Sequence, residues 1–425
     1  MFNTLANAWK IPELRKKLIF TVMMLLIYRV CSFIPVPYID ASQVSSYFQS
    51  TLSNTILGFF DAMSGSAFST ATVLALGIQP YINASIIIQL LTVAIPALER
   101  MAKDEGEAGK KKIERITRYS TVALGLLLGF AYYTMMKNYA TQGLTLITGE
   151  GFLPAMVIVL AFTAGSCFVM WMGEQITEFG IGNGISMILF ANIVSGLPGG
   201  LSRILDLAWW QALIVVVGVA LLIVFIVFIN DAERRIPISY AKRVVGRKIY
   251  GGQSTNLPIK VTMSGVMPVI FASSICSIPA TICAFVPGWS DSWANKNLFA
   301  PTSWPYFAIY VLMIFFFSWF YSTIQYDPVE ISNNLKKNGG FIPGFRPGKP
   351  TADFIQKVIN KIIVFGAIYL SIVAGLPIVA GNVMTGVQNL AIGGTSVIIV
   401  VGVALETVKA LEAQMLMRHY KGFLD

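Results

Sequence analysis

Charge is scarce in this chain. Only 12% of its 425 residues are Asp, Glu, Lys or Arg and 55% are hydrophobic, whereas a soluble domain carries about 25% charged residues. A soluble globular protein is therefore excluded. Because about 20 apolar residues cross a bilayer core of about 30 Å, long uncharged runs such as 211–229 predict an all-α polytopic membrane protein. Runs of this length exclude a barrel of short alternating strands.

Histidine and cysteine are nearly absent. His419 is the only histidine, and the four cysteines lie singly in apolar runs without metal-ligand spacing (Cys31, Cys167, Cys276 and Cys283). Free cysteine usually behaves as a small buried residue, so we expect no metal, disulfide framework or other cofactor. The sequence also shows no pair of buried carboxylates and no nucleophile beside a base, which argues against an enzyme.

A cleavable signal peptide is also lacking. The first apolar run, 18–34, ends in Pro35 and Pro37 rather than in a small-x-small cleavage site. We expect this run to remain as the first membrane span.

The apolar runs mark ten predicted spans, whose ends are uncertain by a few residues. Since the number is even, both termini are expected on one side of the membrane. The spans are 18–36, 70–94, 117–137, 153–172, 181–198, 209–230, 264–287, 304–326, 358–379 and 392–412.

Lys and Arg set the orientation because cytoplasmic segments retain them. Of the 31 basic residues, 27 lie in the N-terminal segment, the C-terminal tail and three loops that share one face (99–118, 231–260 and 327–361). This bias places both termini in the cytoplasm and accounts for the net charge of +10 without nucleic acid.

A repeat relates two parts of the chain. Residues 77–87 (GIQPYINASII) and 265–275 (GVMPVIFASSI) are identical at six of eleven positions, and GNGISMIL (182–189) is echoed more weakly by GGTSVIIV (393–400). We therefore predict two five-helix halves, residues 1–200 and 201–425. Because five is odd, they cross the membrane in opposite senses, with a functional site at their interface.

The repeated helices carry small and polar residues. Small residues also serve close helix packing alone, and that alternative stays open. Recurrence in both halves favours helices that line an interior path. Just before the first copy, residues 58–77 are too short and too polar for a span and predict a re-entrant or external half-helix; an external loop is the alternative.

The two long basic loops exceed what connection requires. Residues 234–260 predict a hairpin around Gly246 that projects Arg243, Arg247 and Lys248. Residues 333–351 are rich in Gly and Pro, which argues against regular helix and leaves Arg346 between two turns. Both loops suit a docking surface, although charge retention alone could explain them.

The chain resembles bacterial SecY, the main subunit of the protein-conducting channel, over essentially its whole length. The motifs that carry the resemblance are GIQPYINASIIIQLL (77–91), GEQITEFGIGNGIS (173–186), YAKRVVGRKIYGGQSTNLPIK (240–260), GVMPVIFASS (265–274), NNLKKNGGFIPGFRPGKPT (333–351) and GGTSVIIVV (393–401). The resemblance implies an hourglass channel between the halves, a plug helix at about 58–70, and a lateral gate between the second and seventh spans.

The resemblance also implies site residues. An apolar pore ring would comprise Ile78, Ile82, Ile185, Leu189, Ile270 and Ile399, with Leu189 standing where isoleucine is common. The plug would include Phe59, Phe60, Asp61, Met63, Ser64 and Gly65. The gate region would include Asn83, Ser85, Gln89, Asn183, Ser273 and Ser274. Motor or ribosome docking would use Arg243, Arg247, Lys248, Arg346 and Lys349.

The implied partners are SecE-like and SecG-like small subunits, a SecA-type motor ATPase, the ribosome, preproteins with their signal sequences, and lipid of the bacterial cytoplasmic (inner) membrane. A secondary transporter, which also uses inverted repeats, is the main rival. It would need a midplane site that is usually ionisable, and the repeated helices carry Asn83, Ser85 and Ser273 but no charge. A lipid-modifying enzyme lacks a catalytic constellation.

Overall fold

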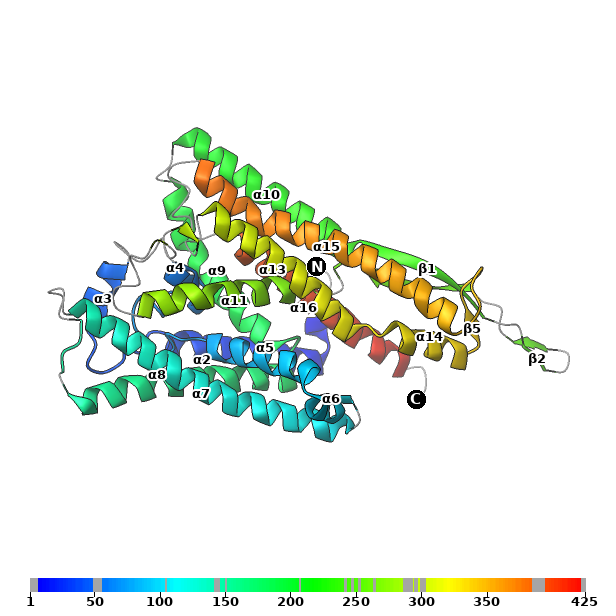
Figure 1. Cartoon of the computed structure of the whole chain (residues 1–425), viewed down its shortest axis with the longest axis horizontal. Helices are drawn as coiled ribbons and strands as arrows, with labels where there is room; N and C mark the ends of the chain where they lie inside the picture. The colour runs from blue at the N-terminus through cyan, green and yellow to red at the C-terminus, as the bar shows by residue number, and fades with distance from the viewer. Residues whose placement is uncertain are drawn as a thin grey trace.

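The computed structural model is predominantly helical (Figure 1). It describes residues 7–48, 56–103, 105–140, 146–149, 151–205, 208–240, 243–245, 248–250, 254–262, 265–285, 293, 297–298, 303–383 and 394–421.

Most helices of the first half lie together at the bottom of Figure 1, and most of those of the second half lie above them. The first half contains α2 (Pro12–Cys31), α3 (Ala41–Tyr47), α4 (Ile56–Ser64), α5 (Gln79–Ala94), α6 (Pro96–Lys103), α7 (Gly106–Ala140), α8 (Phe152–Phe179) and α9 (Gly184–Leu205). The second contains α10 (Trp209–Asp231), α11 (Met267–Phe285), α13 (Trp304–Gln325), α14 (Pro328–Lys337), α15 (Lys349–Val383) and α16 (Gly394–Lys421).

Each of the ten predicted spans overlaps one of these helices. Within the described ranges, five helices are long and apolar enough to cross a membrane, and a sixth is gained if α5 and the start of α6, bent by 105°, count as one span. The apolar parts of α9 and α11 are shorter. The chain is therefore a multi-pass membrane protein, while the count of ten and the cytoplasmic termini remain predictions.

The predicted start of the second span, residue 70, is wrong. Residues 65–78 form turns, and helix α5 begins only at Gln79. Ala71 and Gly77 have positive φ, which interrupts a right-handed helix, and Pro80 suits the first turn of a helix because its missing N–H is not needed there.

The prediction that 333–351 contains no regular helix is also wrong at both ends. Asn333–Lys337 complete α14, and α15 begins at Lys349. The start of α14 is fixed by Asp327, whose Oδ1 accepts hydrogen bonds from the backbone N–H groups of Val329 (2.9 Å) and Glu330 (3.3 Å). Residues 338–348 form the predicted turns, apart from a short strand.

Helix α7 begins well before the predicted apolar span at 117. Its first turns contain Lys, Glu and Arg, which favour helix as strongly as apolar residues do. Hydropathy therefore indicates where the helix can enter lipid, and not where the helix begins.

Strands occur in the two long basic loops. A three-stranded antiparallel sheet has the order β4 (Ser254–Lys260), β1 (Glu233–Tyr240), β5 (Gly340–Phe341), so the second loop adds an edge strand to the first. Beyond it, β2 (Arg243–Val245) pairs with β3 (Lys248–Tyr250), which confirms the predicted hairpin. We call residues 233–260 the basic ribbon, and it extends past the helix ends in Figure 1.

Candidate functional site

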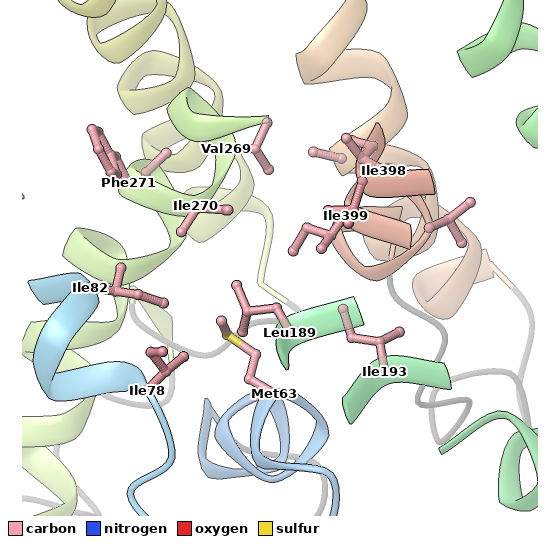
Figure 2. Packing of buried hydrophobic residues seen from close by; sticks show 14 of the residues in the cluster. Met63, Ile78, Ile82, Leu189, Ile193, Val269, Ile270, Phe271, Ile398 and Ile399 are labelled. Carbon is pink, nitrogen blue, oxygen red and sulfur yellow. The ribbon is translucent and has the colours of Figure 1, made fainter. Parts of the chain in front are cut away.

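The aliphatic side chains expected to form a ring meet in one buried cluster. Five of them are between 1% and 6% exposed, and Ile185 is half-buried and packs against the cluster. Figure 2 shows Ile78 and Ile82 on one side, Ile399 on the other, and Leu189 between them. The five most buried members are Ile78, Ile82, Leu189, Ile270 and Ile399.

These residues come from the first two turns of four helices, or from the residue before one of them. Ile78 precedes α5 and Ile82 lies one turn later, while Ile185 and Leu189 are spaced in the same way at the start of α9. Side chains four residues apart share a helix face. The two members of each pair therefore lie on the same side of their helix.

Helix α9 begins where Asn183 places it. The Asn183 Oδ1 accepts hydrogen bonds from the backbone N–H groups of Ile185 (3.0 Å) and Ser186 (3.3 Å). Helices α8 and α9 approach so closely that a Cβ on Gly184 would overlap the carbonyl oxygen of Gly173. The cap therefore sets where α9 begins, and with it the positions of Ile185 and Leu189 along the helix axis.

A cavity of about 400 Å³ leads to this cluster from the side of the basic ribbon. Leu189, Ile270 and Ile399 line it at the cluster, and Pro258 and Lys260 of β4 line it at the ribbon. The wall therefore combines aliphatic ring residues with residues of the ribbon. The remaining lining residues are Ser186, Thr262, Gly265, Val266, Met267, Tyr321, Tyr326, Val403 and Glu406.

Helix α4 meets the cluster with Met63. Met63 is buried and belongs to the same cluster, and α4 contacts both α9 and α11. Figure 2 shows Met63 directly beside Leu189. The segment 58–77, predicted as a half-helix, is thus a short helix that ends at Ser64 and is followed by turns.

The turns after α4 are held by hydrogen bonds to its own end. The Asp61 Oδ1 accepts from the backbone N–H of Ser69 (2.8 Å), and the Ser64 Oγ accepts from that of Phe68 (3.0 Å). Tyr132 of α7 donates its hydroxyl to the carbonyl of Phe68 (2.7 Å). Phe60 is half-buried, and the side chain of Phe59 lies outside the described residues.

Comparison with known proteins decides the family. The family model described as SecY matches residues 72–408. The chain is 43% identical to the protein translocase subunit SecY of Streptomyces scabiei, with all of both chains covered, and 41% identical to that of Thermotoga maritima, with 100% and 98% covered. The chain belongs to the SecY family.

Solved channels share the fold. A structure described as a protein conducting channel superposes with a TM-score of 0.66 at 17% identity, covering 94% of this chain and 92% of that one. Sec61 in the canine ribosome-channel complex gives 0.61 at 16% identity, with the same coverage. SecY is a family of translocase subunits, and its members are not enzymes by themselves. Among the described residues, no three His, Cys, Asp or Glu side chains lie close enough to hold a metal ion.

The gate residues expected in a SecY chain lie on three helices. Asn83 and Ser85 are half-buried and Gln89 is exposed on α5, which contacts α11. Ser273 and Ser274 are buried on α11; the Ser273 Oγ donates to the carbonyl of Ile270 (2.9 Å), and the Ser274 Oγ has no hydrogen-bond partner within the described part of the chain. Asn183 is the N-cap of α9, so its observed contacts are those of a capping residue.

The expected docking residues of this SecY chain lie in the two basic loops. Arg346 and Lys349 are exposed, Arg243 and Lys248 lie on paired strands, and Arg247 lies outside the described residues. The Thr351 Oγ1 donates to the carbonyl of Arg346 (2.8 Å). An apolar core that holds β1, β4, α14 and α15 together comprises Ile236, Ile238, Ile259, Leu335, Ile342, Ile355, Ile359 and Ile363.

Four polar residues that contact α4 or its neighbours are absent from the sequence predictions: Tyr28, Arg29, Gln79 and Asn192. A signal for them existed, because polar side chains inside predicted spans are costly and usually face the interior of a bundle. Arg29 lies in the first apolar run and outside the basic loops, yet its hydrogen bond to the carbonyl of Gly65 depends on the tertiary fold.

Proposed function

We propose that this chain is a protein-conducting channel of the bacterial cytoplasmic membrane, closed at the ring Ile78, Ile82, Ile185, Leu189, Ile270 and Ile399. The observation that carries the proposal is the convergence of these aliphatic side chains from four helices in one buried cluster, three of whose members, Leu189, Ile270 and Ile399, line the cavity. Met63 of α4 lies beside Leu189 in the same cluster and adds to the proposed seal.

An aliphatic constriction suits a passage for polypeptides. Ile and Leu side chains offer an ion no replacement for its hydration shell, so a narrow ring of them blocks ions by dewetting. The same side chains change rotamer to surround a passing chain without recognising its sequence. A ring therefore combines a seal against ions with tolerance for many preproteins.

Sideways release into lipid follows from the contact between α5 and α11, which we propose as the gate. Each Leu or Ile in a segment favours the membrane by about 0.3–0.6 kcal/mol, while one Asp or Arg opposes it by about 2.5–3.5 kcal/mol. An apolar signal sequence or span can thus leave through the gate unaided. Asn83, Ser85, Gln89, Ser273 and Ser274 give this seam a polar character that eases its separation.

Energy for export must come from a partner that docks on the basic ribbon and the Arg346 loop. Two of the structurally similar channels are described in ribosome complexes, canine Sec61 and yeast Ssh1. We propose that a ribosome or a SecA-type ATPase binds this basic face. The cytoplasmic location of the face and of both termini is part of this proposal.

Small SecE-like and SecG-like subunits are proposed to cover part of the apolar exterior. Residues on α2 and α10 such as Val22, Leu26, Leu221 and Val224 are about three-fifths or more exposed. Lipid covers the remainder.

The test is reconstitution with the small subunits and a motor ATPase in vesicles. A preprotein with a signal sequence should become protease-protected inside the vesicles, while vesicles at rest should hold an ion gradient. A solute transporter would move a small solute and leave the preprotein accessible, and that result would overturn the proposal.

A further inference from the structure

The C-terminal end of α4 is held by donors from two other helices. The last carbonyls of a helix have no partners within it. The carbonyl oxygen of Met63 accepts a hydrogen bond from the Asn192 Nδ2 of α9 (2.8 Å), and that of Gly65 accepts one from the Arg29 Nη1 of α2 (3.3 Å). A cation is also favoured at this end by the helix dipole.

Asn192 joins three helices through one amide. Its side chain is fully buried, and its Nδ2 also donates to the hydroxyl oxygen of Tyr28 (2.9 Å), which is fully buried on α2. Both amide hydrogens therefore have acceptors, one on α2 and one on the backbone of α4. The Asn192 Oδ1 is without a hydrogen-bond partner among the described residues. The side chain is therefore oriented so that both of its N–H donors are bonded, while its buried oxygen is not.

Gly65 allows Arg29 and Asn192 to lie close to the end of α4. Its φ is +67°, and a Cβ there would lie 2.7 Å from the Arg29 Nη1, 3.0 Å from the Asn192 Oδ1 and 3.1 Å from the Ser195 Oγ. Neither the backbone conformation nor the space admits a side chain without displacing Arg29 or Asn192, which hold the end of α4, or the neighbouring Ser195.

We propose that Asn192, Tyr28 and Arg29 form a latch that holds α4 in the closed channel and must break before the channel opens. This inference rests on the proposed channel function. The latch contacts main-chain carbonyls, so it holds the position of the helix end independently of most α4 side chains. Asn192 is its central positioning residue because its one amide group donates to both α2 and α4.

Loss of the latch should favour opening. One intramolecular hydrogen bond shifts an equilibrium by roughly two- to tenfold, and Asn192→Leu removes two while keeping a similar volume. We therefore expect the open fraction at rest to rise by about tenfold or more when the net effect of two such bonds is added. Tyr28→Phe, which removes one hydroxyl, should have a smaller effect in the same direction.

Two readouts in the reconstituted complex separate the latch from a merely structural role. The first is ion conductance without a preprotein. The second is export of a preprotein with a shortened apolar signal segment relative to the intact preprotein. Asn192→Leu should raise both while export of the intact preprotein is kept, since an easier opening step lowers the demand on the signal. Ser195→Ala is the matched control, because the Ser195 Oγ donates only to the carbonyl of Asn192 in its own helix.

Unchanged conductance and unchanged signal discrimination in both Asn192→Leu and Tyr28→Phe would overturn the latch. Equal loss of export for both preproteins at normal protein levels would also overturn it, because that is the result of general damage. If Asn192→Leu does not accumulate, Tyr28→Phe alone decides. Failure of the unmodified chain to export any preprotein would instead contradict the proposed function.

Discussion

Ile82 and Ile270 occupy the same position in the two copies of the repeat GxxPxIxASxI, and they lie in one buried cluster on contacting helices, α5 and α11. Figure 2 shows the two side chains next to each other. A repeat that served packing alone would not need its copies to meet at one place. Their meeting supports a site built jointly by the two halves of the chain.

The ring should lose its seal when one member becomes polar. We expect Ile399→Thr to increase ion leakage in the absence of a preprotein, because a hydroxyl supports water in the constriction, and an unpaired hydroxyl in the dry closed ring costs about 1–3 kcal/mol. Ion flux from reconstituted vesicles measures the effect. Ile399→Val, which stays aliphatic, is the control, and equal leakage from the two variants would contradict the role of Ile399.

Gly65 should tolerate no side chain. We expect Gly65→Ala to destabilise the closed arrangement by about 1 kcal/mol or more from the left-handed backbone alone, and further through displacement of Arg29. Resting conductance should increase. Gly218→Ala on α10 is the control because open space surrounds that position, and alanine there should be neutral or stabilising by up to about 1 kcal/mol. Equal behaviour of the two variants would be evidence against a special role for Gly65.

Arg346 should matter for the motor and not for the fold. Its side chain is exposed on a loop fixed by Thr351 and by stacking of Phe345 on Phe354 (centroids 4.3 Å apart). Since loss of a central charged contact costs about 2–5 kcal/mol, Arg346→Glu should reduce motor-driven export by at least about tenfold. Export rate and thermal unfolding measure the two effects. The charge reversal Lys111→Glu, at an exposed position on α7, is the control. Normal export by Arg346→Glu would refute the docking role.

Damage to the apolar core under the basic ribbon should weaken partner binding without affecting the closed ring. Ile238 is 3% exposed on β1, and truncating such a residue to alanine costs about 2–5 kcal/mol. We expect Ile238→Ala to weaken motor or ribosome binding while resting conductance stays normal, because this core does not include the ring. Binding affinity and conductance are measured on one preparation. Ile238→Val, which costs about 0.5–1.5 kcal/mol, should show a smaller loss.

Hydropathy predicted the helices because membrane spans are a local pattern in the sequence. The ring positions were instead implied by the resemblance to SecY, through the motifs that contain Ile78, Ile82, Ile185 and Leu189. What hydropathy missed depends on backbone geometry: the turns at 65–78 require positive φ at Ala71 and Gly77, and a sequence run does not show this.

Long-range polar contacts could not be predicted either. Tyr28 and Asn192 are separated by 164 positions in the chain, and no periodicity within either helix relates them. The same holds for β5, which joins the strand β1 from a distant loop. Such pairings depend on how complete helices and loops pack together.

In the proposed channel, Ile82 and Ile270 face the path of a translocating chain. A photoreactive amino acid at either position, with a preprotein stalled in transit, tests it most directly; Val224 on the exposed face of α10 is the control position. We predict that Ile82 and Ile270 crosslink to the preprotein and Val224 does not. Crosslinks from Ile82 and Ile270 only to lipid or to other proteins would contradict the account.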